Sequence, residues 1–124
     1  MATHEGAVLV VDDDLDIREA LHDVLTDEGY ETVEARDGRQ ALDYLRTNPL
    51  PAVILLDWNM APMNAPQFMT ELAREDAAIS SVPVVLLTAD AKAPDKAKYH
   101  PFSGYLTKPV SLDSLFEVLE RYCG

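Results

Sequence analysis

The sequence predicts an α/β protein in which helices cover both faces of an open, parallel, five-stranded sheet. Three short apolar runs, at 7–11, 52–56 and 83–87, are rich in β-branched residues and have the composition of strands buried on both faces. Weaker strands fit 31–35 and 104–107. Helical patterns lie between these runs, and strict alternation of strand and helix favours right-handed crossovers between parallel strands. The expected fold is therefore doubly wound.

Apolar stripes, together with residues that start or stop helices, predict the helices. A stripe with helical spacing follows the first strand, and Gly29 ends that helix. A second helix begins at Asp37, where Gln40 gives a start resembling a capping box. A third begins near Pro66, and a last one is capped by Ser111. These helices supply the two outer layers of the predicted fold.

The segment 91–100 has the weakest helical pattern. Pro94 lies inside it and Pro101 directly follows it. Proline removes a backbone donor and restricts the residue before it, so few positions are left for a regular helix. We expect the fourth helix to be short or irregular.

Length and charge exclude several classes of function. The 124 residues fit one domain, which we expect at 7–124 after a tail at 1–6. The 22 acidic and 10 basic residues give a net charge of -12, which repels nucleic acids and anionic membranes. Cys123 is the only cysteine, so the chain cannot form an internal disulfide. No apolar run approaches the roughly 18 residues of a membrane span, and we expect a cytoplasmic protein.

Residues with chemical potential lie at the carboxyl ends of the predicted strands. They are Asp12, Asp13, Asp57, Thr88 and Lys108. In such sheets the ligand binds beyond these strand ends. Carboxylates gathered in one cleft repel one another until a divalent cation neutralises them, and an oxygen-rich site suits Mg²⁺ or Mn²⁺. A carboxylate beside a cation and a lysine can attack phosphorus and form an acyl phosphate.

Four segments, VLVVDDDLDIR, ILLDWNM, VVLLTAD and GYLTKPV, resemble in order and spacing the signature segments of the response-regulator receiver family. The resemblance covers nearly the whole chain and implies a flavodoxin-like sheet with strand order 2-1-3-4-5. It also implies a phosphoacceptor domain of two-component or phosphorelay signalling, of the chemotaxis-type single-domain kind. Such a domain receives its phosphoryl group from a histidine kinase or a histidine phosphotransfer protein. It is not otherwise an enzyme, but catalyses its own magnesium-dependent phosphorylation and dephosphorylation.

Carried over residue by residue, the resemblance implies a magnesium site formed by acidic side chains and one backbone group. Asp12 and Asp13 form the acidic pair, Asp57 is the third carboxylate, and Asn59 contributes its backbone carbonyl.

The resemblance also implies a phosphorylation site coupled to a switch. Asp57 accepts the phosphoryl group, which Thr88 and Lys108 contact. The bond from Lys108 to Pro109 is cis, and Tyr105 is the aromatic residue that, with Thr88, changes position on activation. A downstream protein then binds the face made by the helix at 91–100, the fifth strand and the last helix.

The sequence departs from the family pattern close to this output face. Ala61 replaces the usual proline, with Pro62 shifted by one, and Ala65 replaces the usual glycine. The segment KYHPFSGYL replaces the usual run of alanine and glycine before the fifth strand. We therefore expect an atypical output surface beside an intact set of chemical residues.

Three other functions fit parts of the sequence. A receiver-like adaptor that works without phosphorylation fits the altered loop after Asp57. A DxD phosphatase of the haloacid dehalogenase type would use Asp12 as nucleophile, with Asp14 at the required spacing. A flavodoxin-like cofactor carrier fits the fold, although the acidic residues after the first strand would repel its phosphate.

Some of these residues also have simpler structural explanations. Asp14 and Asp16 are better explained as residues that cap a helix and interact with its N-terminus than as metal ligands. Tyr105 fits a core position better than a switch.

Overall fold

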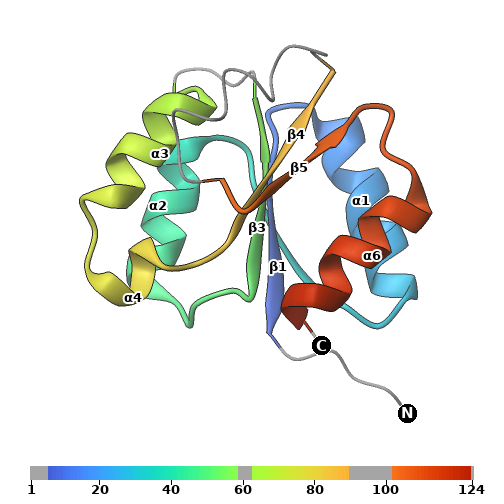
Figure 1. Ribbon diagram of the computed structural model, residues 1–124, viewed down its shortest axis with the longest axis horizontal. Coiled ribbons are helices and arrows are strands. Elements are labelled where there is room, and N and C mark those ends of the chain that lie inside the picture. The colour runs from blue at the N-terminus through green and yellow to red at the C-terminus, as the bar shows by residue number, and fades with distance from the viewer. Residues whose placement is uncertain (1–5, 59–62, 90–101, 124) are drawn as a thin grey trace.

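The computed structural model describes residues 6–58, 63–89 and 102–123. Within this part of the chain, five parallel strands form one sheet in the order β2-β1-β3-β4-β5 (Figure 1). The strands are β1 (Ala7–Val11), β2 (Glu31–Ala35), β3 (Val53–Asp57), β4 (Val84–Thr88) and β5 (Gly104–Thr107). The predicted fold class and strand order are confirmed.

Helices cover both faces of the sheet. On one face lie α1 (Leu15–Asp27) and α6 (Leu112–Cys123), and on the other lie α2 (Gly38–Thr47), α3 (Ala65–Ala73) and α4 (Ala77–Ser80) (Figure 1). Leu9 and Val11 belong to the core with α2 and α3, whereas Val8 and Val10 belong to the core with α1 and α6. Successive strand residues therefore enter different cores, which explains why the runs are apolar throughout.

The helix ends largely follow the predicted signals. The Asp37 carboxylate accepts a hydrogen bond from the Gln40 N–H, but the Gln40 side chain accepts from the N–H of Arg36 instead of Asp37. The reciprocal capping box is thus displaced by one residue. Gly29 directly follows the C-cap of α1 and has φ of 89°, a left-handed conformation that glycine adopts without strain. The hydroxyl of Ser111 accepts from the N–H of Ser114 at the start of α6.

The third predicted helix begins one residue earlier than expected. Asn64 caps α3 and forms a complete capping box with Gln67, and Pro66 is the second helical residue. The short helix α4 was not predicted, because one turn is too short to show an apolar period. It begins where the Asp76 carboxylate accepts from the Ile79 N–H.

Two strands lie one residue later in the chain than the apolar runs at 52–56 and 83–87 indicated. Asp57 is the last residue of β3 and Thr88 the last of β4, so both lie within the sheet. The expected fourth helix at 91–100 lies outside the described residues, as do Asn59 and Ala61. Among the helices that are described, none is long and apolar enough to cross a membrane.

Candidate functional site

The register of the sheet brings the predicted site residues together at the carboxyl ends of the strands. Val11 pairs with Leu56, so Asp12 and Asp57 follow at equivalent positions on neighbouring strands. Thr88 pairs with Thr107, and the Lys108 N–H donates to the Thr88 carbonyl at 2.7 Å. Residues predicted at four separate strand ends thus lie close together in the structure.

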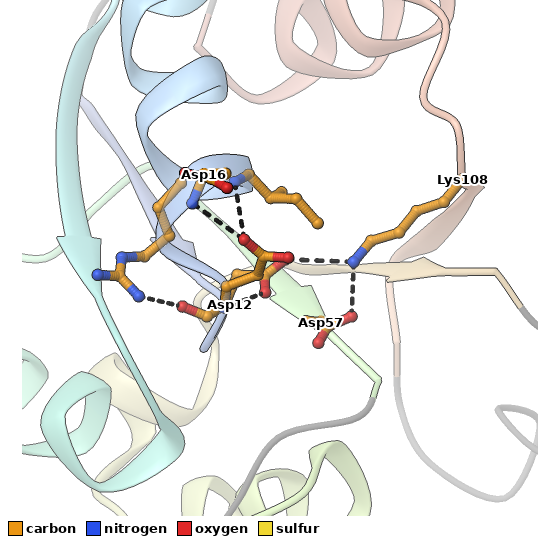
Figure 2. A network of polar contacts seen from close by, with 7 residues as sticks. Asp12, Asp16, Asp57 and Lys108 are labelled. Atoms are coloured by element: carbon orange, nitrogen blue, oxygen red, sulfur yellow. Dashed lines mark hydrogen bonds and ion pairs between the residues drawn. The ribbon is translucent and has the colours of Figure 1, made fainter.

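Lys108 joins two of the carboxylates. Its ammonium nitrogen lies 2.9 Å from Oδ1 of Asp57 and 3.2 Å from Oδ2 of Asp12 (Figure 2). The Asp12 side chain is 1% exposed and that of Asp57 is 10% exposed. Two buried carboxylates therefore share one ammonium group, and the positive charge nearby does not fully compensate them.

Asp12 is held by further contacts on several sides. Its N–H donates to the Ala35 carbonyl at 3.1 Å, and its Oδ1 accepts from the Asp14 N–H at 2.9 Å. Arg18 donates from Nη1 to the Asp12 carbonyl at 2.7 Å. Both carboxylate oxygens and both backbone groups of Asp12 are thus engaged. Arg18 was missed from the sequence, because its role depends on how α1 packs beside β2.

The aspartates that follow Asp12 have different surroundings. Asp14 is the N-cap of α1, where its carboxylate accepts from the N–H groups of Asp16 and Ile17, and Asp16 lies in the first helical turn. The structural explanation of these two residues is confirmed. Asp13 is exposed, and in the described part of the chain it makes no hydrogen bond or ion pair.

Three carboxylates form a group that could hold a metal ion. One oxygen each from Asp12, Asp13 and Asp57 lie within 4.8 Å of one another. Oxygen donors at this spacing suit a hard divalent cation such as Mg²⁺.

Burial and charge shift the ionisation of this site. Burial raises the pKa of the Asp57 carboxyl above its ordinary value and the Asp12 charge adds to the rise, although the Lys108 hydrogen bond opposes it. Burial works to lower the pKa of Lys108, but its hydrogen bond with Asp57 and the two carboxylate charges outweigh this, and the pKa is raised. Lys108 therefore stays protonated, and additional positive charge would favour ionised Asp57.

The remaining predicted residues lie toward the β4–β5 side. Thr88 is buried at the end of β4, with 1% of the residue exposed. Tyr105, on the edge strand β5, is 52% exposed, so its explanation as a core residue is wrong. The Lys108–Pro109 bond is cis. Asn59 cannot be placed, because it lies outside the described residues.

The fold and this edge of the sheet define an α/β protein with an acidic site beyond its strand ends. The family described as the response regulator receiver domain matches residues 8–120. The chain therefore belongs to the response regulator receiver family, which operates in two-component signalling.

Curated relatives include longer proteins. The phosphate regulon transcriptional regulatory protein PhoB of Escherichia coli is 38% identical over 106 residues, which cover 84% of this chain and 45% of PhoB. The PhoB of Klebsiella pneumoniae is 39% identical over the same shares. The chain thus spans less than half the length of these relatives.

Two solved structures match over almost their full length. The chemotaxis protein CheY4 of Vibrio cholerae is 30% identical with a TM-score of 0.85, covering 95% of this chain and 98% of CheY4. The receiver domain of the sensor histidine kinase PA1611 of Pseudomonas aeruginosa is 25% identical with a TM-score of 0.85, covering 99% of each chain. That structure has a magnesium ion coordinated in its active site cleft.

Proposed function

We propose that this chain accepts a phosphoryl group on Asp57 from a phosphohistidine of a histidine kinase or histidine phosphotransfer protein. Asp12, Asp13 and Asp57 would hold a magnesium ion, which would supply positive charge for the transfer. The observation that carries the proposal is the Lys108 ammonium, which contacts both Asp57 and Asp12 beside the three-carboxylate group.

The surroundings of the carboxylates favour Asp57 as the nucleophile. Asp12 is fully buried, and its two carboxylate oxygens accept from Asp14 and Lys108. Asp57 is less buried, and within the described residues only its Oδ1 accepts a hydrogen bond. Its second oxygen is therefore the better placed to attack an incoming phosphorus. This argues against the phosphatase alternative, which needs Asp12 as the attacking group.

The transfer replaces one bond to phosphorus with another. An Asp57 oxygen forms a bond to phosphorus while the bond from phosphorus to the donor histidine nitrogen breaks, and that nitrogen keeps the electron pair. Lys108 neutralises negative charge on the incoming phosphoryl oxygens. When bound, magnesium would supply additional positive charge to the same oxygens and to the carboxylates. The magnesium in the PA1611 receiver domain supports a magnesium site here.

The signal then passes to a protein partner. Thr88 donates its hydroxyl to the phosphoryl group and Tyr105 turns inward, which alters the face formed around β5 and α6. A downstream protein binds this face, and neither nucleic acid nor membrane contacts this chain, whose net charge is -12. The chain acts in the cytoplasm, catalyses its own phosphorylation and dephosphorylation, and has no other enzyme activity.

Labelling with a small phosphodonor tests the proposal. Wild type should take up one phosphoryl group from acetyl phosphate in magnesium and almost none after chelation. Asp57→Asn should not label. Asp16→Asn is the matched control, because it removes an acid from the first turn of α1 and should label like wild type. Full labelling of Asp57→Asn would contradict the assignment. Absence of labelling in wild type would favour the adaptor alternative.

A further inference from the structure

We propose that Arg18 is a positioning residue for the acidic pair Asp12 and Asp13. It orients the peptide between them through the Asp12 carbonyl and thereby directs both carboxylates toward the cation. The inference rests on the proposed function, because it concerns the metal site of that function.

Three elements meet at the Arg18 side chain. Its backbone N–H donates to the Asp14 carbonyl at 3.0 Å, which fixes its place in the first turns of α1. Its side chain is only 14% exposed and returns toward the strand end, where Nη1 donates to the Asp12 carbonyl at 2.7 Å. Its Nε lies 3.6 Å from Oε1 of Glu34 on β2. Arg18 therefore links α1, β2 and the loop that carries the acids.

The Asp12 carbonyl controls where Asp13 lies. The peptide bond is planar, so the direction of this carbonyl also sets the direction in which the chain continues to Asp13. The Asp12 N–H is fixed separately by the Ala35 carbonyl at 3.1 Å. Asp13 is exposed and makes no polar contact of its own within the described residues. Its carboxylate is thus located mainly by the backbone that Arg18 holds.

The charge of Arg18 and its positioning role predict opposite changes in magnesium affinity when Arg18 is replaced. A guanidinium close to a cation site repels the cation, so removing it should tighten magnesium binding. Loss of positioning should weaken binding, and outer residues that orient metal ligands typically contribute about 10- to 100-fold in affinity. The sign of the change therefore separates the two effects of Arg18.

The first experiment measures magnesium affinity from the fluorescence of Trp58, which directly follows Asp57. We expect Arg18→Met to weaken binding by about 10-fold or more. Arg18→Lys should restore part of this loss, because lysine can still donate to the Asp12 carbonyl. Arg36→Met is the matched control, because Arg36 follows β2 at the same edge of the sheet and its side chain is 74% exposed. The Arg36→Met substitution should leave the magnesium affinity unchanged or slightly higher.

The second experiment needs no metal. Amide hydrogen exchange of metal-free Arg18→Met should be faster at Asp14, whose N–H donates to Asp12 Oδ1. Exchange in β1 should be unchanged, which shows that the fold is intact.

The outcomes separate this inference from the proposed function. Equal or tighter magnesium binding by Arg18→Met, with wild-type exchange at Asp14, overturns the inference and leaves the proposed function standing. Failure of wild type to bind magnesium contradicts the proposed function, and the exchange of the Asp14 amide then still decides whether Arg18 holds the loop.

Discussion

The carboxylates at the ends of β1 and β3 differ in their surroundings from Thr88 and Tyr105 on β4 and β5. On the first side, Asp12 and Asp57 are buried and share Lys108, and Arg18 also holds Asp12. On the second side, Thr88 is buried but Tyr105 is 52% exposed. On the acid side (Asp12 and Asp57), the two buried carboxylates therefore already share an ion pair with Lys108, whereas on the response side (Thr88 and Tyr105) the Tyr105 side chain is about half exposed.

This difference fits a division of labour. Preorganised charges need no rearrangement when a phosphoryl group arrives, which favours rapid chemistry. A switch instead needs two states of similar free energy, so that a few kcal/mol from new contacts can shift the populations. We expect changes on the acid side to affect labelling and stability, and changes on the response side to affect output.

The largest effect on stability and labelling is expected for Lys108→Met. Because two buried carboxylates would lose their shared partner, we expect a loss of about 2–3 kcal/mol in unfolding free energy without magnesium. Labelling by acetyl phosphate should slow by about 100-fold or more. Urea unfolding and labelling kinetics measure the two effects. Arg121→Met is the control, because its ion pair with Glu117 is exposed and should contribute less than about 1 kcal/mol.

A second expected effect concerns Asp57 and pH. Burial raises the pKa of Asp57 in the folded protein above its ordinary value of 3.8. The folded state then holds the proton more tightly than the unfolded state, so stability falls as the pH rises from 3.8 through the raised pKa. Asp57→Asn removes this loss and should melt at a higher temperature than wild type at pH 7 without magnesium.

The comparison of Asp57→Asn with wild type has internal controls. The stability difference between Asp57→Asn and wild type should shrink toward acid pH and in saturating magnesium, which stabilises wild type by mass action. Asp16→Asn should be slightly destabilised instead, because Asp16 interacts favourably with the N-terminus of α1. A lower melting temperature for Asp57→Asn at neutral pH would mean that the Lys108 contact outweighs the burial of Asp57.

The fold was predictable because the apolar runs of β1, β3 and β4 supply both cores, and the strand ends identified Asp57 and Lys108. Other features depend on packing that no local pattern encodes. Neighbouring aspartates look alike in the sequence, yet Asp12 is buried and Asp13 exposed. Arg18 reaches the site only because α1 packs beside β2. The exposure of Tyr105 depends on what covers the edge strand β5. The four residues of β5 are too few for a sequence pattern to show which side chains are covered.

Thr88→Ala should abolish the response of Tyr105 while leaving phosphorylation of Asp57 largely intact. The variant should still label on Asp57, within about tenfold of the wild-type rate, because it loses one hydrogen bond of about 0.5–1.5 kcal/mol. In wild type, a phosphoryl mimic should shift the NMR signals of Tyr105 and β5, and in Thr88→Ala it should not. Equal shifts of Tyr105 in both proteins would show that Thr88 does not transmit the signal.

The smallest effect is expected for Tyr105→Phe. Because the side chain is 52% exposed before activation, its hydroxyl should contribute less than about 0.5 kcal/mol to stability. Labelling should stay within about twofold of wild type. A tenfold loss of labelling would place Tyr105 in the chemistry and break the division between the two sides.

Mapping the phosphorylated residue tests the central claim most directly. After labelling with acetyl phosphate in magnesium, borohydride reduces an acyl phosphate on aspartate to homoserine, which peptide mass spectrometry locates. The account predicts homoserine at position 57 in wild type and at no other aspartate. Homoserine at position 12 or 13, with Asp57 unmodified, would contradict it.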